Sequence, residues 1–308
     1  MNTSGDPIPS DERPWAPPLA LLEATGPEAL PFLHNLLTAD LRPLVPASDT
    51  LEARPAGFLN LQGRVLFMAV VAVASPQHIW LILPEIMRAE ASRLLSRYIL
   101  RTKVRLASWQ GTPVLQEPLM ERPDMTPWHG FAQAGDQGEQ YSLVWPSGWT
   151  LHWGSMASDR SLAPPHASSS WAAFHDQEMD TGIPWILPGT SGLFLPQMLD
   201  LEQLGGLSMD KGCYPGQEIV ARVHFRGQVK RHLYHGSAAQ WLEPGTPLYA
   251  EQATAAQRDS HASGHVLGMA PQGQAWKALL VAEAKGRYCS ASGITVEAKQ
   301  PIARPKIP

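Results

Sequence analysis

Cysteine is scarce in this chain, which carries only Cys213 and Cys289 among its 308 residues. Two thiols are too few for an iron–sulfur cluster held by this protein alone, because such a cluster normally takes four cysteine ligands. A chain of this length can bury a large apolar core and does not need a disulfide for stability. We therefore expect both cysteines to be free thiols, as is usual in a reducing compartment.

No hydrophobic run in the sequence is long enough to span a membrane. The longest run, Val65 to Ala74, falls well short of the roughly 20 apolar residues that a membrane span requires. Near the N-terminus stand Asp6, Asp11 and Glu12, where a secretory signal has a basic start and an apolar stretch. We expect a cytoplasmic protein that does not associate with a membrane.

Basic residues are outnumbered, with 24 Lys and Arg against 28 Asp and Glu, for a net charge of −4. This balance argues against a surface that binds nucleic acid, and we expect no direct nucleic-acid binding. One segment differs from the acidic balance of the whole chain, because Lys211 to His235 holds five basic residues and one acid, Glu218. The basic residues are Lys211, Arg222, Arg226, Lys230 and Arg231.

Hydrophobic periodicity predicts an α+β protein. Residues 1–14 are polar and rich in proline, which is typical of a disordered arm. Thr25 is a candidate cap for a helix that runs to about Asp40. Further strands are predicted at Gly57–Leu59, Val65–Ala74, Ile79–Leu83 and Lys103–Leu106, and a further helix at Pro84–Leu100.

The second half of the chain has weaker signals. Strands are predicted at Tyr141–Trp145 and Trp149–Trp153, a linker at Ser158–Ser170 and a helix at Trp171–Asp180. After His235 the pattern changes to short strands at Gly264–Met269, Ala278–Glu283 and Ile294–Glu297. Short strands with turn residues between them predict a small β-barrel at the C-terminal end, residues 238–308.

Cys213 stands in the run Lys211-Gly212-Cys213-Tyr214-Pro215-Gly216-Gln217-Glu218, which we call the Lys211–Glu218 motif. Neighbouring cations stabilise a thiolate, which is the reactive form of cysteine. The motif therefore makes Cys213 a candidate reactive group, with Lys211 beside it. The alternative is that Cys213 fills a gap in the core and that the basic residues, with His224, lie on an exposed strand.

The motif resembles the signature of the YgfZ family of folate-binding proteins. Further runs that resemble this family are Gly182-Ile183-Pro184, Phe194-Leu195-Pro196-Gln197, Leu204-Gly205-Gly206-Leu207-Ser208 and Ala221-Arg222-Val223-His224-Phe225-Arg226-Gly227. The resemblance covers the chain from about Trp15 to His235. Pro215 departs from it, because the family commonly has Thr or Val there and proline removes a backbone donor.

The YgfZ family is related to the glycine-cleavage T-protein, which implies a multi-domain folate-binding fold around a central hole. The resemblance assigns residues 15–110 and 171–237 to discontinuous T-protein-like domains, with 111–170 as an intervening β-rich segment and linker. In the T-protein pattern an acid ahead of Ala-Gly binds the pterin, and Asp180 falls on that position. A carboxylate suits this role because it accepts two parallel hydrogen bonds.

We also place Gln217, Glu218, Arg222 and Arg226 in the cofactor site, with Cys213 and Lys211 as its catalytic groups. The cofactor implied is tetrahydrofolate, whose polyglutamate tail the arginines would attract. The T-protein's essential Asp is missing, because its place falls within Gly63-Arg64-Val65-Leu66-Phe67-Met68. The glycine-cleavage reaction therefore lacks its key group.

Three functional hypotheses follow. The leading one is a tetrahydrofolate-binding accessory protein for iron–sulfur cluster assembly or repair, serving among others the enzymes of tRNA modification. Its partners would be iron–sulfur proteins or cluster-assembly factors. The alternatives are a folate-dependent one-carbon transferase that uses Cys213 on an unknown acceptor, and a non-catalytic interaction module.

Overall fold

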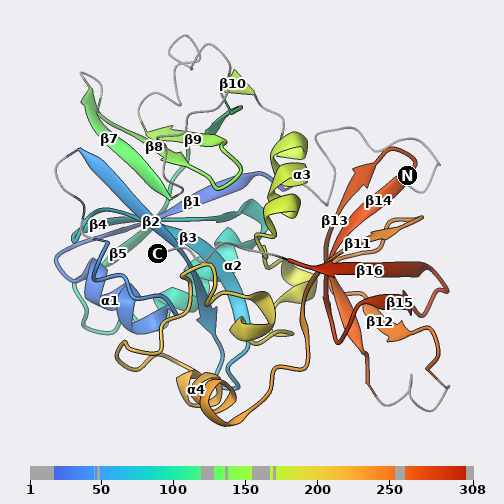
Figure 1. Ribbon diagram of the computed structural model, residues 1–308. Coiled ribbons are helices and arrows are strands. Elements are labelled where there is room, and N and C mark those ends of the chain that lie inside the picture. Colours follow the sequence, from blue (N-terminus) through green and yellow to red (C-terminus); the bar gives the residue numbers. More distant parts are fainter. Residues whose placement is uncertain are drawn as a thin grey trace.

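The computed structural model describes residues 17–44, 46, 49–118, 128–135, 138–154, 167–168, 171–253 and 261–302. These residues form a large curved sheet with helices and, beside it, a closed β-barrel (Figure 1). The α+β class and the C-terminal barrel are confirmed. The predicted arm 1–14 and nearly all of the predicted linker Ser158–Ser170 lie outside the described residues.

The large sheet has ten strands within the described residues, in the order β10-β6-β9-β8-β7-β2-β3-β4-β1-β5. Strand β2 pairs with β3 along one edge and with β7 along the other, so the strands of the predicted intervening segment, β6 to β10, continue the sheet. The central strand β3 is buried over most of its length because apolar residues on both of its faces are covered. The strands are β1 (Leu19–Thr25), β2 (Thr50–Leu59), β3 (Val65–Ser75), β4 (His78–Pro84), β5 (Arg105–Ser108), β6 (Val114–Gln116), β7 (His129–Gly135), β8 (Gly138–Val144), β9 (Thr150–Gly154) and β10 (Ala167–Ser168).

The helices are α1 (Ala29–Leu36), α2 (Glu85–Ser96), α3 (Trp171–Thr181), η4 (Pro188–Thr190), η5 (Pro196–Leu199) and α4 (Gln217–Arg226). Three of the helices were predicted, and of these α2 and α3 begin and end near the predicted positions, whereas η4, η5 and α4 were not predicted. The predicted start of α1 at Thr25 is wrong, because Thr25 ends strand β1 and pairs with His78 and Arg105. Gly26, at φ 125°, then turns the chain into the helix. No helix of the described part of the chain is long and apolar enough to span a membrane.

Helix α4 corrects the reading of His224 and the nearby arginines as residues of a strand. Gly216 has φ 78°, which breaks any extended run, and the ten residues that follow are helical. Only Val220 of this helix is buried, so the apolar alternation expected of a half-buried strand is absent. Helix α4 is therefore a surface helix.

The barrel closes in the strand order β11-β14-β13-β12-β15-β16. Its interior holds a separate cluster of apolar side chains that includes Leu248, Val266 and Leu280. Helix α3 lies between the large sheet and the barrel (Figure 1), and its contacts with the barrel run mainly to β13. The strands are β11 (His232–Ala238), β12 (Pro247–Ala250), β13 (Gly264–Gln272), β14 (Ala275–Ala282), β15 (Gly286–Cys289) and β16 (Thr295–Pro301).

Candidate functional site: an anchored cysteine loop and helix α4

Lys211 anchors the Lys211–Glu218 motif to the end of helix α1. Its ammonium Nζ donates hydrogen bonds to the backbone carbonyls of His34, Leu37 and Ala39. These carbonyls lie in the last turn of α1 and just beyond it, where the helix dipole is negative and favours a cation. The lysine is only 6% exposed, so its charge is directed into the protein and holds the start of the motif in place.

Burial changes the titration of two motif residues. Desolvation lowers the pKa of Lys211 to about 8, and the nearby Asp40 carboxylate opposes that shift. The ammonium also lies 5.1 Å from the ring centre of Tyr214, within reach of a cation–π contact. Burial raises the pKa of Tyr214 to about 12. Lys211 and Tyr214 therefore point inward and fix the loop on both sides of Cys213.

The Leu204–Ser208 run packs against the same end of α1. The Thr38 hydroxyl donates to the carbonyl of Gly206 at 2.5 Å and accepts the Gly57 N–H at 2.8 Å. Ser208 N–H donates to the Thr38 carbonyl at 3.0 Å. A Cβ on Gly206 would lie 2.8 Å from the carbonyl oxygen of Pro55, so a larger residue there would collide with β2.

Gly216 joins the motif to the turn between β2 and β3. A Cβ at Gly216 would lie 2.4 Å from the carbonyl oxygen of Asn60, and its φ of 78° also favours glycine. The turn itself is held by the Asn60 side chain, which accepts hydrogen bonds from the N–H groups of Gln62 and Arg64 at 3.0 Å each. A Cβ at Gly63 would lie 3.1 Å from Cβ of Ile219, so the first turn of α4 rests on this hairpin.

Cys213 is exposed on this anchored loop. The neighbouring Gly212 has open space on the side where a Cβ would stand. The reading of Cys213 as core filler is therefore wrong, because its side chain faces solvent. Cys289 differs, since it lies half-buried in β15 with Sγ 3.9 Å from the hydroxyl of Thr295.

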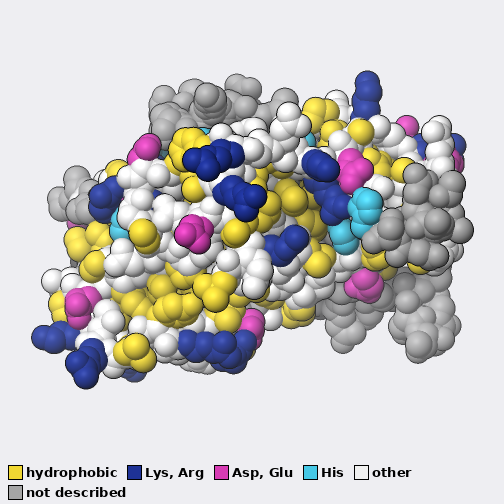
Figure 2. Space-filling view, turned by 90° about the horizontal axis from the view of Figure 1, so that it is seen from below, with side chains coloured by type: hydrophobic (Ala, Val, Ile, Leu, Met, Phe, Trp, Pro, Cys, Tyr) yellow, Lys and Arg dark blue, Asp and Glu magenta, His cyan; other side chains and the backbone are white. Residues whose placement is uncertain are grey.

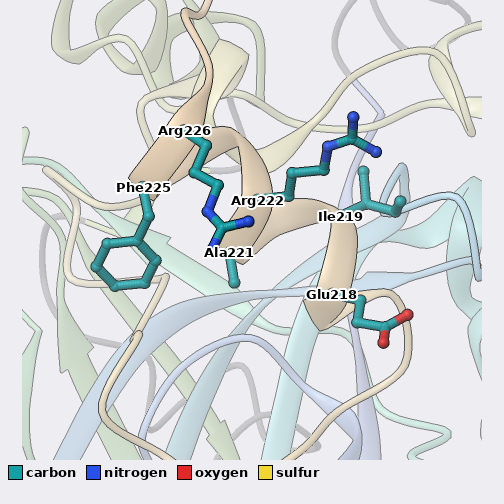
Figure 3. A pocket seen from close by; sticks show the side chains of 6 residues that line it. All are labelled: Glu218, Ile219, Ala221, Arg222, Phe225 and Arg226. Atoms are coloured by element: carbon teal, nitrogen blue, oxygen red, sulfur yellow. The ribbon is translucent and has the colours of Figure 1, made fainter.

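Side chains of helix α4, including Glu218 of the motif, line an open hollow at the surface (Figure 3). The hollow has a volume of about 520 Å³. It combines two guanidinium groups and one carboxylate with apolar surface. Its lining residues are Glu218, Ile219, Ala221, Arg222, Phe225 and Arg226.

Asp180 lies elsewhere, in the last turn of α3. Its side chain is 64% exposed and its Oδ1 lies 2.9 Å from Nζ of Lys277 on barrel strand β14. Figure 1 shows α3 beside the barrel and α4 at the far lower edge of the large sheet. The structure therefore brings Glu218, Arg222 and Arg226 together, with Gln217 at the start of the same helix, but places Asp180 apart from them.

The basic residues from Lys211 to Arg231 do not form one continuous charged surface. Lys211 is committed to backbone carbonyls, and Arg231 donates to the Ala262 carbonyl and lies 3.6 Å from Glu283. Arg222, Arg226 and Lys230 remain exposed. Among the described residues no cluster of three or more His, Cys, Asp or Glu side chains is arranged to hold a metal ion.

Sequence reasoning missed Lys277 and Thr38. Lys277 stands nearly one hundred positions after Asp180, and nothing in its own strand marks it as the partner of an acid. Thr38 was part of the predicted helix end, and its hydrogen bonds to Gly57 and Gly206 depend on a fold that brings three segments together. The paired glycines at 205 and 206 were the one signal of a close backbone approach.

The fold defined by this sheet and barrel is that of the glycine-cleavage T-protein class. The aminomethyltransferase T of Bartonella henselae aligns over 92% of this chain and 83% of its own chain, with a TM-score of 0.66 and 12% sequence identity. At that identity the likeness shows a shared fold alone. No family model matches the chain.

Comparison of sequences identifies the family more specifically than the shared fold does. The chain is 30% identical to the tRNA-modifying protein YgfZ of Edwardsiella ictaluri (strain 93-146) over 274 residues, which is 77% of this chain and 78% of that protein. It is 44% identical to the tRNA-modifying protein YgfZ of Escherichia coli O127:H6 over 91 residues, 29% of this chain and 27% of the relative. The chain belongs to the YgfZ family.

Proposed function

We propose that this protein is a tetrahydrofolate-binding accessory protein that supports iron–sulfur cluster assembly or repair, including that of enzymes that modify tRNA. Its relatives carry the name tRNA-modifying protein, which supports the link to tRNA modification. The observation that carries the proposal is the exposed thiol of Cys213, held in a loop whose two ends are fixed by Lys211 and Gly216. A thiol presented in this way is accessible to a second protein.

Lys211 acts as a positioning residue in this proposal. Its Nζ is held by three carbonyls at the end of α1, so it fixes the loop rather than reaching a substrate. Cys213 is the group that contacts the partner, as a nucleophile or as a sulfur ligand. Since the chain has only two cysteines, the remaining ligands of any cluster would come from the partner or from a small thiol.

The residues at the end of α3 fit a pterin if one carboxylate oxygen of Asp180 binds both the pterin and Lys277. Asp180 is exposed and carries the carboxylate that a pterin's amino group and ring N–H require. Its Oδ1 already accepts a hydrogen bond from Lys277 at 2.9 Å, so the pterin would share this oxygen with the lysine. When bound, the folate would supply a one-carbon carrier or a structural ligand, and Asp180 would orient its pterin end.

Aminomethyl transfer is not part of the proposal. Phe67 and Met68 occupy the β3 positions where the T-protein pattern implies an acid, and both are fully buried. Neither side chain can accept a proton or hold an amine. The proposal is therefore limited to folate binding and to the chemistry of the Cys213 thiol.

Two measurements test this function. Calorimetric titration should show saturable binding of tetrahydrofolate to the full chain, and its absence would remove folate from the proposal. In cells lacking the protein, Cys289→Ser should restore the activity of iron–sulfur enzymes that modify tRNA, whereas Cys213→Ser should not. Both variants should unfold at the temperature of the parent, because neither thiol is part of the core clusters. Full restoration by Cys213→Ser would make the thiol dispensable and overturn its assigned role.

A further inference from the structure

Exposed apolar side chains gather around helix α4. Phe225 is 71% exposed, Ile219 37% and Leu61, on the turn between β2 and β3, 76%. The turn and the helix are in contact, because a Cβ on Gly63 would lie 3.1 Å from Ile219. Figure 2, seen from the side on which α4 lies, shows hydrophobic side chains interspersed with Lys and Arg on this face. We call Leu61, Ile219, Arg222, Phe225 and Arg226 the α4 face.

The helix turns its larger apolar residues outward. Positions 218, 222 and 226 are four residues apart, as are 221 and 225, and 218 and 221 are three apart, so all five share one side of the helix. Figure 3 shows these residues among those that line the hollow. Val220 is the buried residue that attaches the helix, and the Val220 carbonyl accepts a hydrogen bond from the Gln197 side chain at 2.8 Å. Phe225 therefore contributes nothing to the core, although its exposure costs hydration free energy.

Arginine and aromatic residues together are typical of the energetic centres of protein interfaces. Arg222 and Arg226 lie on either side of Phe225 along the helix, and within the described residues neither forms an ion pair with an acid of this chain. Their charge is available for carboxylates from outside. A surface complementary to the α4 face would present an apolar side chain with acidic residues around it.

Nucleic acid fits this face less well. Binding a phosphate backbone takes several cations acting together, whereas the hollow holds two arginines and the acid Glu218, in a chain with a net charge of −4. Three aliphatic or aromatic side chains beside two arginines favour a protein partner, because apolar area at the centre of the patch can be buried against a protein side chain.

We propose that the α4 face is the docking surface for a partner protein that presents an apolar side chain framed by carboxylates. Docking there places the partner next to Cys213, because the motif that carries Cys213 leads directly into α4. The proposal rests on the proposed function in that the docked partner is the protein that meets the thiol. It does not depend on folate, whose assigned acid, Asp180, lies on α3.

Site-specific photo-cross-linking in cells tests the surface without disturbing the fold. The photoreactive amino acid p-benzoylphenylalanine replaces Phe225 in one variant and Leu61 in another. Phe131 is the matched control, since it is a 49% exposed phenylalanine on β7, in another part of the large sheet. We expect the variants at 225 and 61 to give the same protein adduct, at least ten-fold more abundant than any adduct from position 131.

Mass spectrometry of that adduct should locate the cross-link in an acidic segment of the partner. The charge-reversed variant Arg222→Glu/Arg226→Glu should reduce the adduct by at least ten-fold, and exchange of the partner's nearby acids for lysine should restore it. Adducts only with RNA, adducts only with a second copy of this chain, or yields at 225 no higher than at 131 would each overturn the proposal. Failure of tetrahydrofolate to bind the parent would count against the folate assignment and leave the cross-link result standing.

Discussion

The ammonium Nζ of Lys277, on barrel strand β14, lies 2.9 Å from Oδ1 of Asp180 on α3. It lies at the same distance from Oδ1 of Asp176, one turn earlier on that helix. The lysine side chain is largely buried, and this burial alone would lower its pKa. Hydrogen bonds to Asp180 and Asp176 outweigh the burial and raise the pKa. The acid assigned to the pterin therefore also ties α3 to the barrel.

This relationship allows a matched test of the pterin assignment. Asp180→Asn should weaken tetrahydrofolate binding by roughly ten-fold or more. The amide cannot accept both of the pterin's hydrogen bonds, and a donor left unpaired once the bound pterin excludes water costs on the order of 1–3 kcal/mol. Asp176→Asn removes the other carboxylate from Lys277 and should bind folate like the parent. Calorimetric titration measures the affinities, and thermal unfolding checks that the two variants lose similar stability. Equal weakening in both would assign the effect to the contact between α3 and the barrel.

Helices α3 and α4 lie apart (Figure 1), and this separation predicts what the arginines do for folate. The double variant Arg222→Ala/Arg226→Ala should bind tetrahydrofolate with a single glutamate as tightly as the parent, because neither guanidinium is near Asp180. Calorimetry at low ionic strength is the appropriate measurement, since screening by salt would hide a long-range contribution. A loss of ten-fold or more would show that the bound folate reaches both helices.

Lys211→Met tests the anchor of the Cys213 loop. The substitution keeps most of the side chain's volume but removes the donor for three buried carbonyls, which should cost on the order of 2–4 kcal/mol. Lys230→Met is the control, because Lys230 is exposed on the segment that follows α4. Chemical denaturation at pH 7 gives both free energies of unfolding, and a loss below about 0.5 kcal/mol for Lys211→Met would contradict the anchoring role.

The stability difference between the parent and Lys211→Met should also depend on pH, in a direction set by the pKa of Lys211. The pKa of Lys211 is about 8 in the folded protein, below its ordinary value of 10.5. Between these two values the unfolded chain binds a proton that the folded protein has lost, so this residue makes stability rise with pH. The difference in stability between the parent and Lys211→Met should therefore grow from pH 8 to about 10.

Glu178 is a second buried group whose titration can be isolated. It is 1% exposed on α3, it accepts a hydrogen bond from the Ser147 hydroxyl at 2.7 Å, and burial raises its pKa to about 8. The folded protein therefore holds a proton that the unfolded chain loses near pH 4.5, and stability from this group falls as pH rises toward 8. Glu178→Gln cannot ionise and should be more stable than the parent at pH 8, with the difference shrinking toward pH 4.5. Denaturant unfolding at several pH values measures it, and a difference that does not change with pH would contradict the assigned protonation.

Local patterns were sufficient for most of the elements. The apolar run from Val65 to Ala74 and the turn before it predicted β3, and the repeated short strands after His235 predicted the barrel. These signals depend on residues close together in the chain. Thr25 shows their limit, because a residue that can cap a helix can also end a strand, and pairing with β4 and β5 decides the outcome.

The sequence by itself determined the family, the motif around Cys213 and the presence of an acid at position 180. Tertiary structure alone decided where their charges go. It directs the ammonium of Lys211 into the end of α1, pairs Asp180 with Lys277 across nearly one hundred residues, and leaves Arg222 and Arg226 exposed on a helix beside Phe225. The physical reason is that a charge is stabilised by partners within a few ångströms in space, and a one-dimensional pattern does not show which distant segments the fold brings that close.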